Sequence, residues 1–568
     1  MPVKKSIAAL TVTVLAALLF FSSCSRLPEQ TKYIPKEAVM VMGINGKSLV
    51  QKGAWSELTG DSVLQHLKAA VNPQQQEYLN HPAETGVNTL STFYVFFKPD
   101  PRFGNGYTGV IAPLNNADKF AAFMQKSLDT IPVKKEGDIS SMLIGKKGLL
   151  AWNKRVAVLL IPAANSISTD DIKQIVVSKD SLFSHLNSDY SGIGQLLHAT
   201  DTAFNAPELY AEMHRLFTLS KSSAISSNDK FVALQEEAAD MTFWVNMQEL
   251  YKAAPPNSPL LRADYFDNSY LAAAVNFNNG AIEVTGKSYA NDQLMAIARK
   301  YSGPTIDMHS IKDLPSANIV ALMAAAFKPD YIKAVLNYYG LDGMINLALD
   351  SQGLNLDTLL HAFSGNVLIG ATDLKVKPAG ADSSDAPGWP SVNWLFSAGL
   401  DKGGVFDRLL LLADSSNLIR KQGDKYVVQM PGSTITLLKT DKSFTVASSG
   451  EIADKFESGH NNTAIDPAIL QHFEGQPVAF YLNIHAIMQV IPEDRVNNEG
   501  KQNMEMMKGL FSDFYMTGGQ VTKDAAEFKM ELNFLHKDEN SLIQLIRMGT
   551  KLYQQRDSAS VSHSPTGG

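Results

Sequence analysis

The clearest shortage in this chain is of cysteine: Cys24 is the only one among 568 residues. A single thiol excludes internal disulfides and metal sites built from several cysteines. Positive charge is not in excess either, because 50 basic residues face 57 acidic ones and the formal net charge is −7. Binding to nucleic acid would need a basic patch, and the sequence offers no excess of basic residues to form one. We therefore expect no nucleic-acid partner. With 45% hydrophobic residues, the chain can bury the cores of more than one domain without cross-links.

Motifs that bring catalytic or metal-binding groups together are also missing. The sequence has no His-Glu-x-x-His and no Gly-x-Ser-x-Gly, and His460, His472 and His485 are expected to lie apart on a loop, a helix and a strand end. The stretch Gly43–Ser48 is not a phosphate loop, because Val41 stands where its first glycine is required. We therefore predict no catalytic residue, no metal ligand and no cofactor.

The N-terminus has the layout of a secretory signal peptide. Lys4 and Lys5 precede an uncharged run over 7–21 and the small pair Ser22-Ser23, and the run is shorter than the ~20 residues that cross a bilayer. The stretch Phe21-Ser22-Ser23-Cys24 resembles the lipobox of bacterial lipoproteins, with Phe21 where leucine is usual. We predict a signal peptide over 1–23 and a lipidated Cys24. The alternative is a secreted protein with an incidental buried thiol.

The residues after Cys24 suggest where the anchored protein faces. Residues 24–32 are polar and suit a short tether. Ser25 stands where aspartate would signal inner-membrane retention in familiar Gram-negative lipoproteins, and no acidic cluster follows. We expect a lipid-anchored protein of the cell envelope, on the outer membrane and facing the periplasm, whose contact with the membrane is its N-terminal lipid.

Self-comparison indicates an internal duplication. Three blocks recur in the same order: 34–42 at 314–322, 133–138 at 419–424, and 243–247 at 480–484. A series in one order is hard to obtain by chance. We predict two similar halves, 33–303 and 304–556, followed by a disordered tail over 557–568.

Within the halves, strand patterns lead into short helices. Four such segments span 39–52, 241–254, 319–335 and 478–490, and in three of them Asn45, Asn246 or Asn483 stands where it can cap the helix. Asn278-Asn279-Gly280 separates two strand-like runs and predicts a tight hairpin. The expected fold class is α+β, a tandem duplication with antiparallel sheets and helices packed on one side.

The segments 33–39 and 43–49, following a lipobox, resemble a family of Bacteroidetes lipoproteins catalogued as domain of unknown function 4836. The resemblance implies the cell-envelope address and brings no activity, cofactor or catalytic residue.

The functional expectation is a non-catalytic binding or assembly role. The partner would be another envelope protein or a ligand held where the halves meet. One alternative is a glycan-binding component that uses Trp389, which follows the polar loop 379–388 and could stack on a sugar ring, while Trp394 reads as a strand residue. Another alternative is a periplasmic hydrolase with a dispersed active site.

Overall fold

We analysed a computed structural model of the chain, which describes residues 27–53, 82–128, 131–144, 148–162, 205–253, 262–350, 353–376, 390–401, 404–430, 433–459, 461, 463–491 and 498–561. The chain divides into two compact units. Unit 1 comprises 1–48, 70–181 and 189–245, and unit 2 comprises 49–69, 182–188 and 246–568. The segment predicted to be a signal peptide, Cys24 and Trp389 lie outside the described residues.

The described strands of unit 1 form an antiparallel sheet in the order β8-β1-β2-β3-β7-β6-β5-β4. Side chains alternate along the strands: in β3 the buried positions are Tyr107, Gly109, Ile111 and Pro113, the pattern of a strand with one face on a core. The bounds are β1 Met40–Asn45, β2 Thr92–Lys98, β3 Tyr107–Pro113, β4 Lys134–Glu136, β5 Ile139–Ile144, β6 Gly148–Trp152, β7 Val156–Pro162, β8 Met241–Asn246, α2 Gly46–Gln51, α6 Ala117–Ser127, α9 Ala206–Phe217 and α10 Asp229–Gln235.

Unit 1 contains a buried ion-pair network that fixes helix α9. The Glu212 side chain has no exposed surface and accepts hydrogen bonds from Tyr107 Oη at 2.5 Å, Arg102 Nη2 at 2.8 Å and Arg215 Nη2 at 2.6 Å. Burial alone would raise the pKa of Glu212, but the hydrogen bonds from Arg215 and Tyr107 outweigh it and hold that pKa below its usual value. Asp100 behaves in the same way, since hydrogen bonds led by the one from Arg102 overcome the effect of burial and lower its pKa.

The described strands of unit 2 form an antiparallel sheet in the order β9-β10-β20-β19-β18-β11-β12-β13-β17-β16-β15-β14. The strands are β9 Tyr270–Asn278, β10 Ala281–Tyr289, β11 Ile319–Ala326, β12 Phe363–Val376, β13 Pro390–Leu400, β14 Arg420–Gln422, β15 Lys425–Met430, β16 Ser433–Lys439, β17 Ser443–Ala447, β18 Val478–Leu482, β19 Phe511–Val521 and β20 Ala526–Phe534.

The helices of unit 2 are α11 Met247–Ala253, α12 Asp292–Tyr301, α13 Met308–Lys312, α14 Pro329–Tyr338, α15 Asp342–Asp350, α16 Leu356–Leu360, α17 Gly404–Ser415, α18 Gly450–Glu457, α19 Pro467–Phe473, α20 Ile484–Val490, α21 Asn498–Lys508 and α22 Ser541–Val561. Helix α22 thus extends into the segment 557–568, which the sequence predicts to be a disordered tail. No helix in the described part of the chain is long and apolar enough to cross a membrane.

Pairings among β1–β8 recur among β11–β18. Strand β1 pairs with β2 and β8, and β11 pairs in the same way with β12 and β18. Strand β3 pairs with β2 and β7, and β13 pairs in the same way with β12 and β17. The hairpin β9–β10 corresponds likewise to β19–β20. The α+β class with antiparallel sheets is confirmed. The recurrence agrees with a tandem duplication, which stays a prediction because topology alone does not establish a common origin of the halves.

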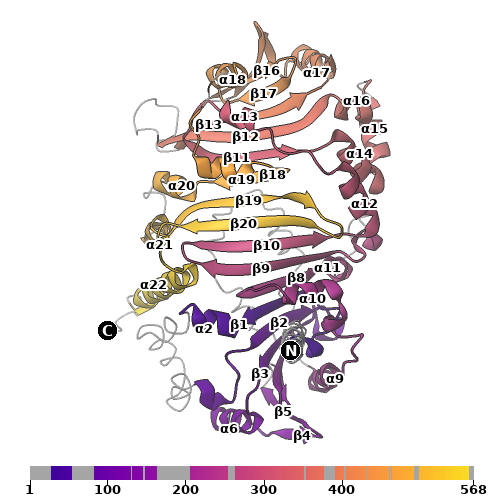
Figure 1. Ribbon diagram of the computed structural model, residues 1–568, viewed down its shortest axis with the longest axis vertical. Coiled ribbons are helices and arrows are strands. Elements are labelled where there is room, and N and C mark those ends of the chain that lie inside the picture. The colour runs from indigo at the N-terminus through magenta and orange to yellow at the C-terminus, as the bar shows by residue number, and fades with distance from the viewer. Residues whose placement is uncertain are drawn as a thin grey trace, which may run out of the picture. The chain divides into compact units, whose positions relative to one another are not determined.

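Helices α13, α18 and α19 cover one face of the unit 2 sheet (Figure 1). Their buried residues pack with strand residues in one core, including Ile311 from α13, Phe456 from α18 and Phe473 from α19. On β11 and β12 the alternate positions face the other way, and there Met323 and Ile369 are 38% and 43% exposed. The core that fixes α13 and α18 therefore lies on one face of the sheet only.

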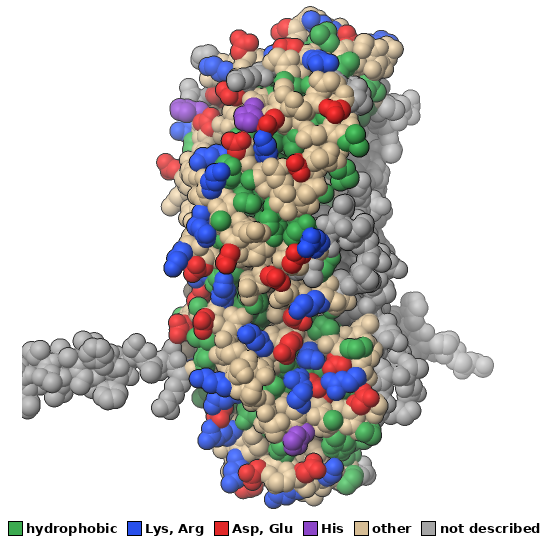
Figure 2. All heavy atoms as spheres, turned by 90° about the vertical axis from the view of Figure 1, so that its right-hand side faces the viewer, with side chains coloured by type: hydrophobic (Ala, Val, Ile, Leu, Met, Phe, Trp, Pro, Cys, Tyr) green, Lys and Arg blue, Asp and Glu red, His purple; other side chains and the backbone are tan. Residues whose placement is uncertain are grey.

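Acidic and basic side chains are interspersed on the face of the molecule shown in Figure 2. Their mixture matches the nearly balanced composition of 50 basic and 57 acidic residues.

Candidate functional site

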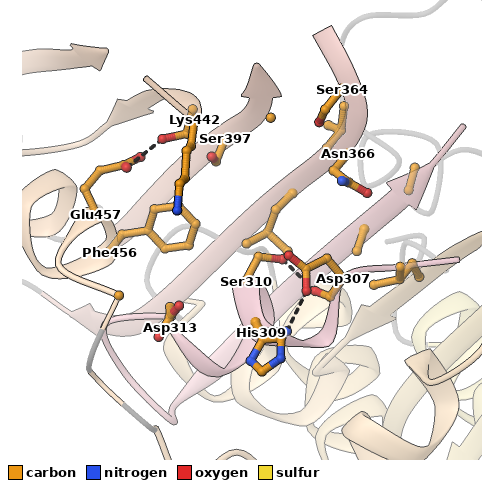
Figure 3. A pocket seen from close by; sticks show the side chains of 18 residues that line it. Asp307, His309, Ser310, Asp313, Ser364, Asn366, Ser397, Lys442, Phe456 and Glu457 are labelled. Atoms are coloured by element: carbon orange, nitrogen blue, oxygen red, sulfur yellow. Dashed lines mark hydrogen bonds between the residues drawn. The ribbon is translucent and has the colours of Figure 1, made fainter. Parts of the chain in front are cut away.

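A cavity of about 280 Å³ opens in unit 2 beside the core under α13 and α18 (Figure 3). It is lined by six parts of the chain: residues 306–313 around α13, 324–325 of β11, 364–368 of β12, 397–399 of β13, 442–443 at the β16–β17 turn, and the end of α18 with Gly459. The volume is close to the lower end of the range for small-molecule sites. Its polar lining residues are Asp307, His309, Ser310, Asp313, Ser364, Asn366, Ser397, Lys442, Ser443 and Glu457.

One wall is set by the short helix α13. Asp307 caps it, accepting a hydrogen bond from the His309 amide at 2.9 Å, and the Ser310 hydroxyl donates to the Asp307 carbonyl at 2.7 Å. Ile311 has no exposed surface and anchors the helix in the core. Because Ile311 fixes the apolar side of α13, the polar residues that precede and follow Ile311 in the sequence are held at the cavity (Figure 3).

The opposite wall contains a chain of hydroxyl groups that ends on a carboxylate. Glu457, at the end of α18, accepts hydrogen bonds from Ser443 Oγ at 2.6 Å and Thr445 Oγ1 at 2.5 Å. Thr445 has no exposed surface, and its Oγ1 lies 3.0 Å from Ser397 Oγ. A threonine hydroxyl has one proton, and Thr445 donates it in the hydrogen bond to the Glu457 carboxylate. Thr445 therefore accepts from the Ser397 hydroxyl in the second contact, which leaves the Ser397 oxygen able to accept from a bound molecule. The network fixes Glu457 and Ser397 in place.

Five other polar side chains of the lining have no such partner. Within the described part of the chain, no hydrogen bond or ion pair is made by the side chains of His309, Asp313, Ser364, Asn366 and Lys442. They come from three parts of the chain: His309 and Asp313 from α13 and its end, Ser364 and Asn366 from β12, and Lys442 from the β16–β17 turn (Figure 3). Polar groups that converge on a cavity without satisfying one another are available to a bound molecule.

The histidines that came nearest to a cluster in the sequence are not brought together. His472 stacks on Tyr515 with ring centroids 3.9 Å apart, while His485 lies on α20 with Nδ1 3.2 Å from the Lys508 carbonyl. His460 is outside the described residues. Among the residues that the structure describes, no group of three or more histidine, cysteine or acidic side chains could hold a metal ion.

Other sequence interpretations can be checked directly. Strand β1 ends at Asn45 and α2 begins at Gly46, so the strand-to-helix interpretation of this stretch is confirmed. Trp394 is a half-buried residue of β13 that pairs with Ala371, as expected of a strand residue. Cys24 as the lipidated residue and Trp389 as a sugar contact stay predictions.

Sequence reasoning missed the cavity residues. They come from short segments spread along the chain from Ile306 to Gly459, and none carries a recognisable motif. The nearest signal was the pattern of an aspartate before a short helix, which occurs at many helix starts. The cavity lies inside the segment 304–556, whereas the sequence led us to expect a ligand where the two halves meet, and that expectation stays a prediction.

Comparison with known proteins finds one family model that matches the first part of the chain. Residues 30–189 match the model of the family described as "Domain of unknown function (DUF4836)". The predicted resemblance to domain of unknown function 4836 is confirmed over these residues, while its description as a family of Bacteroidetes lipoproteins stays a prediction. The DUF4836 match ends before the cavity, whose lining begins at Ile306.

No curated protein matches the chain. Two solved structures do, crystal forms I and IV of TP0453, at 5% and 6% sequence identity and TM-scores of 0.24 and 0.23. They cover 47% and 49% of this chain and 81% and 87% of their own. At these TM-scores the likeness supports no argument about function.

Proposed function

We propose that the protein is a lipid-anchored lipoprotein of the cell envelope that binds a small polar solute in the cavity of unit 2. The binding role rests on one observation: five polar side chains from three parts of the chain line a single cavity, and none has a partner among the residues that the structure describes. The envelope location is supported by the signal-peptide layout and the position of Cys24.

The walls of the cavity support binding because they are fixed before a solute arrives. The Ser397–Thr445–Glu457 network holds one wall, and the capped helix α13 with its buried Ile311 holds the other. A site that is already ordered loses little conformational entropy on binding. The free side chains at its surface then determine which solute is bound.

The volume limits the size of the solute. A cavity of about 280 Å³ would hold roughly nine water molecules at ~30 Å³ each. This suits a compact solute better than an extended polymer. A protein partner at the envelope, which the sequence also allowed, would have to use a different surface.

The test is to close the cavity without disturbing the core. Asn366 lies on β12 at the cavity and is exposed, so Asn366→Trp places a large side chain there. Ile369→Trp is the matched control, because Ile369 is exposed on the same strand and its side chain points to the opposite face of the sheet.

Thermal unfolding should be recorded for the wild type and both variants with a panel of small sugars, amino acids, amines and carboxylates. Binding to the folded state raises the unfolding temperature. We expect at least one solute to stabilise the wild type and Ile369→Trp but not Asn366→Trp. Stabilisation that survives in Asn366→Trp, or none with any solute, would contradict the proposal.

A further inference from the structure

The free charges of the cavity have both signs. Lys442 reaches it from the β16–β17 turn, and Asp313 from the end of α13 (Figure 3). Neither forms an ion pair with the other, nor with any other residue that the structure describes. The cavity thus offers one ammonium and one carboxylate at separate places.

Neutral groups lie along the strands that line the cavity. Ser364 and Asn366 belong to β12, and Ser397 to the neighbouring β13. Their hydroxyl and amide groups can donate or accept, so they suit a polar ligand of either sign. These groups add affinity but do not select a charge.

The other charged groups of the lining are already engaged or share the sign of Asp313. Glu457 accepts two hydroxyl hydrogen bonds, and the Asp307 side chain accepts from the amide of His309. A purely anionic ligand would have to bind near three carboxylates to reach one ammonium. A purely cationic ligand would leave Lys442 unpaired in the same cavity.

We infer that the solute is a small zwitterion, whose anionic group pairs with Lys442 and whose cationic group pairs with Asp313. This inference rests on the proposed function, because it names the ligand class of the same cavity. Each charged group of the ligand would make charge-assisted hydrogen bonds to its partner.

The expected discrimination follows from the exposure of these groups. Hydrogen bonds to charged groups change affinity by factors from about ten to a hundred. Lys442 is exposed, so solvent weakens its contribution toward the lower end. A zwitterion should therefore bind about tenfold more tightly than a matched ligand that carries only one of its charges.

Titration calorimetry with matched probes tests the inference. The probes are ω-amino acids with two to six carbons, each compared with the alkylamine and the alkanoate of equal length. We expect one chain length at which the amino acid binds about tenfold more tightly than both analogues. Lys442→Met should then remove its advantage over the amine, and Asp313→Asn its advantage over the alkanoate.

Each substitution keeps the side chain close to its original size, and both replaced side chains lie at the cavity surface rather than in the core. An amine, alkanoate or uncharged solute that binds as tightly as every amino acid of the series would overturn the zwitterion inference while leaving solute binding intact. A tenfold preference that persists in both variants would also overturn it. If no solute of any class binds, the proposed function itself would be wrong.

Discussion

Replacing Glu212 by glutamine should destabilise unit 1 strongly, because three donors would lose their ionised acceptor. Glu212 is fully buried and accepts from Tyr107, Arg102 and Arg215. Breaking a buried charge pair from one side typically costs about 3–5 kcal/mol. The two arginine side chains are 44% and 39% exposed, so water can rehydrate them. We therefore expect the low end, a loss of about 3 kcal/mol in the free energy of unfolding.

Hydrogen exchange measured by mass spectrometry can assign this loss to unit 1. A loss of about 3 kcal/mol increases amide exchange by roughly two orders of magnitude where exchange requires unfolding of the unit. We expect this increase in peptides from α9 and β3. The control is Glu451→Gln, which removes an exposed ion pair with Lys455 on α18 and should change nothing measurable. If amide exchange in α9 of Glu212→Gln stays within a few-fold of the wild type, the ionised Glu212 side chain is not needed for the stability of unit 1.

The same pair of proteins should differ in their response to acid. The folded-state pKa of Glu212 is lowered, so its contribution to stability is complete above the unfolded-state value of about 4.3 and is lost as the pH falls through the folded-state value. The wild type should lose more stability than Glu212→Gln between about pH 5 and pH 3. The free energy of unfolding would be measured by urea titration at each pH. An equal loss in the wild type and in Glu212→Gln would show that Glu212 is not the group responsible.

Three further outcomes follow from the structure and the sequence. Gly365→Ala should impair folding, seen as less soluble protein, because Gly365 has φ of 93° and an added Cβ would clash with the Phe327 carbonyl oxygen; wild-type yield would contradict the clash. Thr445→Val should cost about 1–3 kcal/mol in urea unfolding, because Glu457 loses a buried donor; an unchanged midpoint would show that the network is not needed. Cys24→Ser should move the protein from the membrane to the soluble fraction, and retention on membranes would exclude lipid anchoring through this residue.

Local features of the fold could be predicted from the sequence because short-range chemistry determines them. The side chains of Asn45, Asn246 and Asn483 each accept a backbone hydrogen bond from the helix that follows, at 3.2, 3.2 and 2.8 Å, as predicted. The predicted hairpin is confirmed between β9 and β10, where Gly280 adopts a φ of 68°.

The cavity and the Glu212 network could not be predicted in this way. Asp313 and Lys442 are distant in sequence, and only the packing of α13 and α18 on one face of the sheet brings them to one cavity. Glu212 and Tyr107 are likewise 105 residues apart. Neither residue pair has a spacing that local periodicity can detect, because tertiary packing sets the contact.

Solute binding in the unit 2 cavity is tested most directly by native mass spectrometry of the protein purified gently from cells that produce it. We expect a retained small solute, released on denaturation, that carries an amino and an acidic group. The solute should be present in Ile369→Trp and absent from Asn366→Trp. A solute retained equally by both variants, or none from any of the three proteins even after incubation with the solute panel, would contradict the claim that this cavity is a binding site.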